Sequence, residues 1–478
     1  MRRYSRSSPG LLRLLGLLGP LALLAAACSG AAGAPEGTAA DVRALTGAHT
    51  RIVWVQSNDN DPRAEGEGLV LMGLDTDDGR GERVIGAERR SRVKPMLTAD
   101  GARIVFSTRI VPGPAEVFVV NWDGTGQRKV ADGFALDVWK DPADGREWVY
   151  LGTKNVDYDF STVARVPLDG PGPPELVWDK TLVGMDTFQV SADGRLAGGL
   201  WPWPEAGVAR LPNGPLEILG QGCWTGLAHV RGPLFWYFDG AHRNLTLVDA
   251  ETKGRWVVNI NNPPGFDGAE VYHPRWSPHP RFLTMTGPYN QGGDNQARTG
   301  GPQTEVYVGR FSPDFSRVEA WARATTNARG DSSPDVWIDI AGSPHATTPA
   351  GPVGPPGVHA GRGAATPADT GRLVVNVRLT RPGPVPTPES ILPYRNALVV
   401  NEYEVMDVVS GSHAGTTIHI AQWIIRDGRM LPGARKLAGA AFTLTIDRYD
   451  AHPELEGERL ISDRETSDLT LYYDPRVD

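Results

Sequence analysis

The chain has 478 residues with 57 Gly, 40 Pro and 14 Trp, and its 40% hydrophobic and 22% charged residues indicate a turn-rich globular protein. The formal net charge of -8 is spread without long runs of one sign, which argues against a nucleic-acid partner because phosphate binding needs a concentrated basic face. The length exceeds what one hydrophobic core normally serves, so at least two domains are expected.

The first 30 residues are typical of an export signal. A basic start precedes an apolar run over residues 11–27, and Cys28 follows three alanines. Basic, apolar and small residues in this order form a bacterial secretion signal, and the apolar run is shorter than the ~20 residues of a membrane span. With Cys28 directly after the alanines, the segment resembles the lipobox of bacterial lipoproteins.

The lipobox resemblance implies a signal peptide over residues 1–27, lipidation of Cys28, membrane attachment through that lipid, and a flexible tether over residues 28–49. In Gram-negative members of the family a residue other than Asp after the cysteine favours the outer membrane, and Ser29 stands there. The alternative is an ordinary cleaved signal with an incidental cysteine. The other cysteine, Cys223, lies between apolar stretches and is expected to be a buried, inert thiol.

A pattern of strands and tight turns recurs through residues 50–341. Each unit has a turn carrying Asp-Gly or a substitute, then an alternating apolar strand, a second strand and another turn. The turns fall at Gly101, Gly145, Gly194, Gly232 and Pro280, with spacings of 44, 49, 38 and 48 residues. Such spacing is about one four-stranded propeller blade, and Asp-Gly turns are what antiparallel hairpins require.

The turn Ser191-Ala192-Asp193-Gly194, followed by a largely apolar strand, resembles those of TolB-type, WD-repeat-like propellers of bacterial envelope proteins. The resemblance implies an all-β propeller but leaves function open, because this fold hosts binders, scaffolds and enzymes. The strand at 51–55 has no first strand before it, and the strand at 335–339 has no strand after it. Together they are predicted to complete one blade and close a ring of six. Seven blades are the alternative if residues 287–304 contain further strands.

Residues 342–371 consist largely of Gly, Pro, Ala and Thr and are predicted to be a flexible linker. Strand-like segments follow at 372–380, 397–410, 416–426, 441–447 and 469–473. Their partial alternation fits half-buried strands. They predict an independently folding second domain over residues 372–478, either a small β-barrel of OB-like type or a sandwich.

The acidic turn at residues 58–61 brings hard oxygen ligands together, so Asp59 and Asp61 are the candidates for a calcium site. A solvated turn between strands explains the same residues, and no other cofactor is expected. The ten histidines show no zinc-type spacing, and no nucleophile elbow follows an apolar strand.

Aromatic residues give the clearest functional clue. Trp201, Trp203 and Glu205 lie in a proline-containing loop, where two rigid rings and a carboxylate would suit a sugar ring or a proline-rich peptide. The alternative is that both tryptophans cap the propeller core. The glycine-rich stretch that contains Tyr289 and Asn290 is typical of a binding loop at a propeller face.

These features favour a lipid-anchored binding or scaffold protein of the cell envelope whose propeller presents one face to an envelope protein or a polysaccharide. The competing interpretation is a secreted carbohydrate-active enzyme, a glycosidase or a lyase, with its site on the propeller funnel. Two carboxylates about 5 to 10 Å apart in an open central pocket would favour the enzyme. A funnel without convergent titratable groups would favour binding.

Overall fold

The computed structural model describes residues 39–57, 68–86, 92–108, 114–156, 159–170, 172–228, 234–266, 269–279, 281–289, 304–342, 354, 371–391, 394–432, 436–455, 457–463 and 470–476. Within these ranges the chain is largely β-structure, with one α-helix, α1 (Ala39–Thr46). No helix there is long and apolar enough to cross a membrane. The expected signal peptide, Cys28 and most of the expected linker lie outside the described residues.

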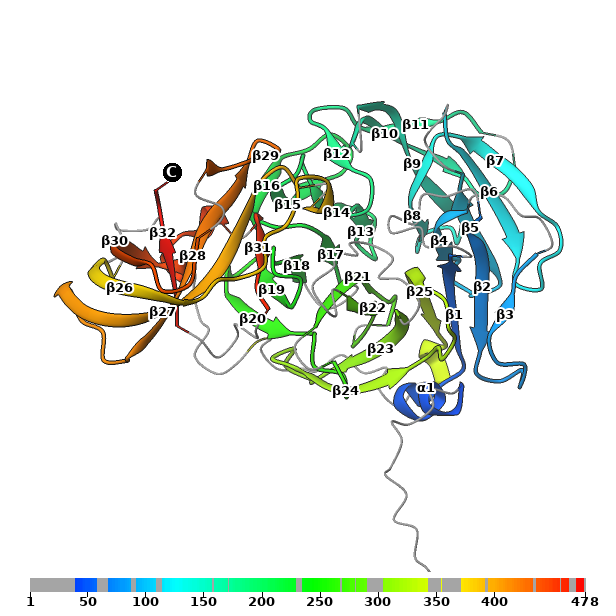
Figure 1. Ribbon diagram of the computed structural model, residues 1–478. Helices are drawn as coiled ribbons and strands as arrows, with labels where there is room; N and C mark the ends of the chain where they lie inside the picture. Colours follow the sequence, from blue (N-terminus) through cyan, green and yellow to red (C-terminus); the bar gives the residue numbers. More distant parts are fainter. Residues whose placement is uncertain are drawn as a thin grey trace, which may run out of the picture. The chain divides into compact units, whose positions relative to one another are not determined.

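Residues 50–338 form six separate sheets, the blades of a propeller (Figure 1). Blade 1 contains β25 (Asp331–Ile338), β1 (Thr50–Gln56), β2 (Val70–Asp75) and β3 (Arg83–Val84); blade 2 contains β4 (Val93–Leu97), β5 (Arg103–Ser107), β6 (Glu116–Asn121) and β7 (Arg128–Asp132). Blade 3 contains β8 (Phe134–Lys140), β9 (Glu147–Val156), β10 (Asp159–Pro167) and β11 (Glu175–Trp178), with β12 (Val183–Gly184) paired to β10.

The remaining blades repeat the same order of four strands. Blade 4 contains β13 (Gln189–Val190), β14 (Leu196–Leu200), β15 (Glu205–Arg210) and β16 (Leu216–Gln221). Blade 5 contains β17 (Thr225–Leu227), β18 (Leu234–Phe238), β19 (Asn244–Asp249) and β20 (Arg255–Asn259), and blade 6 contains β21 (Glu270–Trp276), β22 (Phe282–Tyr289), β23 (Glu305–Phe311) and β24 (Val318–Arg323). The first strand given for each blade is its innermost one.

Blade 1 joins the two ends of the propeller segment. β25 pairs antiparallel with β1, with Thr50 opposite Ile338 and Val53 opposite Asp335. Figure 1 shows the blue strand β1 beside the yellow-green strand β25. Pairing the ends removes the exposed sheet edges that an open ring would leave. The predicted six-bladed ring, with its end strands in one blade, is confirmed.

Two turns show why Asp-Gly recurs after the innermost strands. Gly101 has a φ of 67° and Gly194 a φ of 72°, which glycine adopts without steric cost. A Cβ atom on either would lie 2.5 Å from a tryptophan ring, that of Trp337 and that of Trp139 respectively. Each indole N–H also donates to a carbonyl oxygen in the turn it covers, at 2.9 and 3.0 Å. Glycine therefore lets one blade's innermost tryptophan pack onto the next blade's turn.

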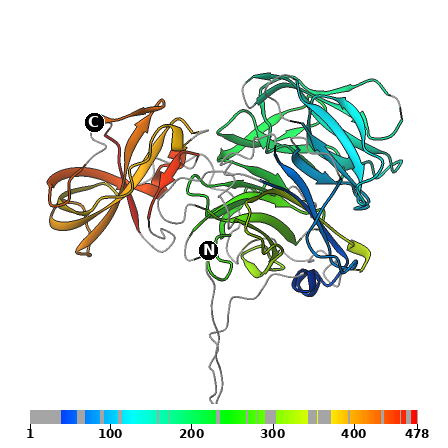
Figure 2. The same ribbon diagram turned by 45° about the vertical axis from the view of Figure 1, so that its right-hand side comes forward.

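The C-terminal strands, orange to red in Figure 2, form a closed five-stranded barrel. They are β26 (Leu373–Arg381), β27 (Ala397–Ser410), β28 (Thr417–Arg426), β30 (Ala441–Arg448) and β32 (Leu471–Asp474). The ring runs β26-β27-β28-β32-β30 and back to β26, with β29 (Arg429–Met430) and β31 (Arg459–Ile461) at its margins. Among the described residues, the 3-10 helix η1 (Ile340–Gly342) follows β25 of the propeller. The 3-10 helices η2 (Glu389–Ile391), η4 (Tyr449–Ala451) and η5 (Pro453–Leu455) lie between barrel strands. Of the two predicted architectures, the barrel is confirmed.

The barrel and the propeller share one hydrophobic cluster. Ile391, Tyr394 and Ile461 from the barrel domain pack in the same buried cluster as Trp224 and Tyr272 from blades 5 and 6. If the barrel folded alone, these buried apolar side chains would be exposed to solvent. Independent folding of the barrel domain stays a prediction.

Helix α1 lies within the segment expected to be a flexible tether. Its Val42 and Leu45 are buried in one cluster with Ile52 of β1 and Val308 of β23. Residues 39–46 are thus packed onto the propeller, because the two apolar side chains on one face of the helix can be buried against strands of blades 1 and 6.

Candidate functional site

Three innermost strands contain the same backbone feature. Lys94 in β4, His273 in β21 and Ser333 in β25 have φ values of 48°, 52° and 49°, and a proline follows each of them. Non-glycine residues rarely adopt this region, and L-residues before proline favour extended conformations. Each residue coincides with a register shift between its strand and the neighbouring one. The three positions are therefore strained bulges on the inner wall of the ring.

These bulges line one pocket, which we call the axial well. Its wall consists of Lys94 and Pro95 from blade 2, residues 186–189 at blade 4, residues 224–225 at blade 5, residues 273–275 in blade 6 and residues 333–334 in blade 1. Because innermost strands of five blades converge on it, the pocket lies at the propeller axis.

Arg275 crosses the axis beneath the well. Its Nε donates to Asp335 Oδ1 at 2.8 Å in the neighbouring blade 1, and its Nη2 donates to Asp137 Oδ1 at 2.9 Å in blade 3, three blades away around the ring. The second oxygen of each aspartate accepts a backbone N–H, from Leu97 at 2.7 Å and from Val190 at 2.8 Å. One guanidinium thus links five blades and forms the floor of the well.

Lys94 reaches from blade 2 to the chain segment that precedes blade 4. Its side chain is 8% exposed, and its Nζ donates to the Met185 carbonyl oxygen at 2.7 Å. Burial lowers the pKa of Lys94 to about 7; nearby Arg275 lowers it too, whereas Asp186 acts in the opposite direction. Asp186 lines the well, and within the described residues its carboxylate has no hydrogen-bond partner.

Neutral side chains hold the other walls in place. Gln189 accepts the Leu227 N–H at 3.1 Å and donates to the Trp276 carbonyl oxygen at 3.3 Å, so it joins blades 4, 5 and 6. Thr225 Oγ1 donates to the Thr187 carbonyl oxygen at 2.9 Å. These bonds provide partners for the polar groups of the inner wall and fix the shape of the well.

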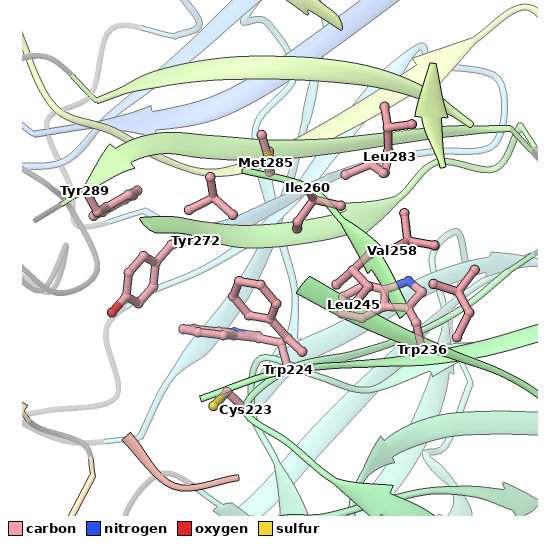
Figure 3. Packing of buried hydrophobic residues seen from close by; sticks show 14 of the residues in the cluster. Cys223, Trp224, Trp236, Leu245, Val258, Ile260, Tyr272, Leu283, Met285 and Tyr289 are labelled. Carbon is pink, nitrogen blue, oxygen red and sulfur yellow. The ribbon is translucent and has the colours of Figure 1, made fainter. Parts of the chain in front are cut away.

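A second polar group, here called the interdomain cluster, lies between blades 5 and 6 and the barrel. It consists of Cys223, His242, Glu270, Tyr394 and Arg459. Arg459 donates from Nη1 to Glu270 Oε2 at 2.7 Å and from Nη2 to Oε1 at 2.9 Å. The Tyr394 hydroxyl lies 2.6 Å from His242 Nε2 and contacts Cys223 Sγ. Figure 3 shows Trp224 near Cys223 of this cluster. The Trp224 ring also packs against the His242 ring and lines the well.

The pKa values of the titratable groups in the interdomain cluster lie far from neutral pH. Burial raises the pKa of Cys223 to about 12 and lowers the pKa of His242 to about 4. Burial alone would raise the pKa of Glu270, but the guanidinium of Arg459 holds it at about 2. At neutral pH the cluster therefore combines a thiol, a neutral imidazole and one ion pair. The expectation that Cys223 is buried is confirmed.

The predicted aromatic platform needs a correction at Trp201. Its ring is 3% exposed and packs against Trp178 and Phe188, with centroids 4.8 and 6.0 Å away. Its indole N–H donates to the Gly207 carbonyl oxygen at 3.0 Å. Trp201 is therefore a core residue behind the wall of the well, as the alternative interpretation held, and the two-ring platform does not form.

The two companions of Trp201 contact neighbouring side chains. Trp203 is half-buried and packs edge-on against Tyr394 of the barrel domain, with centroids 5.8 Å apart. Glu205 begins β15 and accepts a hydrogen bond from Gln221 Nε2 at 3.1 Å.

Of the second expected binding loop, the structure describes Tyr289 at its start. Tyr289 ends strand β22, is fully buried, and contacts the Thr286 hydroxyl at 2.7 Å. Asn290, Asp59 and Asp61 lie outside the described residues, as does Cys28. In the part of the chain that the structure describes, no group of three or more His, Cys, Asp or Glu side chains could hold a metal ion.

Comparison with known proteins gives structural likenesses only. No family model and no curated protein matches the chain. The chain is similar to TolB from Acinetobacter baumannii, with 15% identity over 62% of this chain and 69% of that chain and a TM-score of 0.43. It is also similar to the β-propeller domain of the Trilobed protease from Pyrococcus furiosus, with 10% identity over 54% and 78% of the two chains and a TM-score of 0.31. These TM-scores are low, so the propeller assignment rests on the strand pairings described above.

Proposed function

We propose that this chain is a lipid-anchored binding protein of the cell envelope that presents the mouth of the axial well to a protein or glycan partner. The observation that carries the proposal is the set of strained residues, Lys94, His273 and Ser333, around one polar pocket. Backbone strain of this kind persists only where the surrounding structure enforces it, and it gathers at binding and catalytic sites.

The lipid anchor is supported by the sequence around Cys28. Ten residues, 29–38, lie between this cysteine and the start of α1 at Ala39. Fully extended, such a segment spans at most about 35 Å. A lipidated Cys28 would thus hold the propeller close to the membrane surface, where envelope partners are accessible.

Binding is better supported than glycoside hydrolysis. A glycosidase needs a pair of carboxyl groups directed at the scissile bond, one of them protonated. Burial raises the pKa of Asp335, but its oxygens are occupied by Arg275 and the Leu97 N–H. Asp137 is occupied in the same manner. Among the described residues that line the well, this leaves Asp186 as a single carboxylate, and one carboxylate does not supply acid and nucleophile together.

Crosslinking in the producing cells, followed by affinity capture, tests this function. The wild-type chain should capture an envelope component, and a variant with Lys94→Met and Asp186→Ala should lose it. Asp144→Asn is the matched control, because Asp144 is exposed in the β8–β9 turn at the far ends of the innermost strands. Equal capture by the well variant and the control would contradict the proposal.

A further inference from the structure

Lys94 is a buried lysine whose amine is not held by a carboxylate. Its Nζ donates to the Met185 carbonyl oxygen at 2.7 Å and lies 5.9 Å from the centre of the Phe134 ring. In the part of the chain that the structure describes, Lys94 forms no ion pair. Lysine is almost never buried so deeply unless it is paired with an acidic side chain. A carbonyl oxygen and a ring hold an ammonium less firmly than a carboxylate does, so the neutral amine is accessible here.

The charges near Lys94 leave its amine partly neutral at physiological pH. The charged and titratable groups that act on it or line the same pocket are Arg275, Asp186, Asp137, Asp335 and His273. Burial is the largest effect and Arg275 adds to it, so the pKa of Lys94 falls to about 7 although the three carboxylates act in the opposite direction. About half of Lys94 is therefore a free amine at pH 7, and the free amine is the nucleophile.

The backbone holds this amine at the wall of a small pocket. Lys94 has a φ of 48° and lies within the register shift between β4 and β5. Its side chain is 8% exposed, and the axial well has a volume of about 40 Å³. A water molecule needs roughly 10 to 15 Å³ of such volume, so the well accommodates about three non-hydrogen atoms next to the amine.

The wall of the well favours an uncharged guest that accepts a hydrogen bond. Ser333 lines the well, and among the described residues its hydroxyl has no hydrogen-bond partner. Arg275 is already paired with two aspartates, and Asp186 acts on Lys94, so carboxylates outnumber cations around the pocket. An anion is therefore disfavoured, whereas the oxygen of a small neutral molecule can accept from Ser333.

From the unpaired amine and the size and charge of its pocket, we infer that Lys94 is a modification site whose amine condenses with a small uncharged aldehyde or ketone. In the first step the lone pair of neutral Nζ forms a bond to the carbonyl carbon, and one N–H proton moves to the carbonyl oxygen. In the second step the C–O bond breaks, and the oxygen leaves as water with the other N–H proton. The products are a neutral imine on Lys94 and one water molecule, so no oxidant or reductant is consumed.

Two related reactions of the amine fit less well. Carbon dioxide would convert Lys94 into a carbamate anion near Asp186, in a pocket that already has an excess of carboxylates. Carbonyl compounds that carry a phosphate or a carboxylate bring the same charge and exceed the volume of the well. Condensation requires no envelope partner, so an adduct on Lys94 and capture of a partner are separate outcomes.

Reductive trapping on the full chain tests this site. The protein is incubated at pH 7 with acetaldehyde and cyanoborohydride, which reduces an imine to a stable ethylamine, and peptide mass spectrometry follows each lysine. Lys94 should be ethylated roughly tenfold faster than Lys140, which is exposed at the end of β8. Benzaldehyde should label Lys140 but not Lys94, because its ring is too large for the well. Equal ethylation rates, or labelling of Lys94 by benzaldehyde, would overturn the inference.

The pH profile distinguishes a reactive amine from one that is merely accessible. Ethylation of Lys94 should rise up to about pH 7 and then level off, whereas that of Lys140 should continue to rise above about pH 9. Asp186→Asn should move the Lys94 midpoint to lower pH, because the Asp186 carboxylate favours the ammonium. Asp144→Asn, in an exposed turn, should leave it unchanged. A Lys94 profile that follows that of Lys140, or one that Asp186→Asn does not shift, would contradict the assignment.

Discussion

Arg275 and Asp137 form an ion pair across the propeller axis, from blade 6 to blade 3, with 2.9 Å between Nη2 and Oδ1. The same guanidinium holds Asp335 of blade 1 at 2.8 Å. Strand pairing connects residues within a blade, whereas this bridge connects blade 6 with blade 3 and with blade 1. It therefore fixes the floor of the well against movement of individual blades.

Replacing Arg275 with Met should destabilise the propeller strongly, because it leaves Asp137 and Asp335 buried without their cation. Removing one partner of a buried ion pair costs about 3 to 5 kcal/mol. Chemical denaturation of the variant measures the loss. Arg195→Met is the control, because the Arg195 side chain is 76% exposed and lies 3.9 Å from Asp193. Loss of this surface pair should cost under about 1 kcal/mol. Equal stability of the two variants would show that the bridge has no structural role.

Gly101→Ala should destabilise the chain more than Gly79→Ala. The φ angle is 67° at Gly101 and 66° at Gly79, so both substitutions should cause the same backbone strain of roughly 1 to 2 kcal/mol. A Cβ at Gly101 would also lie 2.5 Å from the Trp337 ring, while nothing lies within 4 Å of a Cβ at Gly79. The difference between the two melting temperatures isolates the contact between blades 1 and 2. No difference would contradict that contact.

The strand that closes the ring should respond to pH through Asp331. Its side chain is buried at the start of β25, and its Oδ1 accepts from Gln56 Nε2 of β1 at 3.1 Å. Burial raises the pKa of Asp331 from 3.8 to about 7. Since the folded state then binds the proton more tightly than the unfolded state, stability falls as pH rises from about 4 through about 7.

The expected size is about 4 kcal/mol, from ~1.4 kcal/mol for each unit of pKa shift. The asparagine side chain of the Asp331→Asn variant cannot ionise. Between pH 4 and pH 8 the free energy of unfolding of this variant should therefore rise relative to that of the wild type. Parallel curves for the two proteins over this range would refute the assignment. Asp144→Asn, on an exposed turn, should follow the wild type.

The propeller and the barrel should unfold in one transition, because they share a hydrophobic cluster and the buried pair of Arg459 and Glu270. Arg459→Met should lower the stability of both domains by about 3 to 5 kcal/mol. Arg378→Met is the control, since Arg378 pairs with Glu404 at the surface. Calorimetry that resolves two independent transitions, one of them insensitive to Arg459, would instead support separate folding.

Local signals were enough to predict the propeller. Asp-Gly turns are specified by adjacent residues, and the unpaired strands at 51–55 and 335–339 identified their common blade, β25 with β1. The axial well could not be read in this way. Lys94, His273 and Ser333 lie far apart in the sequence and meet only when the ring closes.

A signal for the well was nevertheless present. Proline cannot donate to a strand ladder, so Lys94-Pro95, His273-Pro274 and Ser333-Pro334 marked positions where innermost strands leave regular pairing. The prediction of an exposed aromatic platform at Trp201 was wrong for a different reason. Trp201 has the same composition around it whether its ring faces solvent or Trp178, and only the packing distinguishes the two.

The domain interface also lacked a local signal. Tyr394 and Arg459 lie on connections of the barrel, and nothing around them indicates that their partners are His242 and Glu270. The linker rich in Gly and Pro suggested that the two domains fold separately. Its composition, however, describes only the connection between them. It carries no information on the surfaces at either end.

The central claim, that the partner binds at the mouth of the axial well, is tested most directly by site-specific photo-crosslinking in the producing cells. A photoreactive residue in place of Ser333, which lines the well, should form an adduct with an envelope component. The same residue in place of Asp144, exposed in the turn after β8, should form none. Adducts at position 144 and none at position 333 would contradict the account.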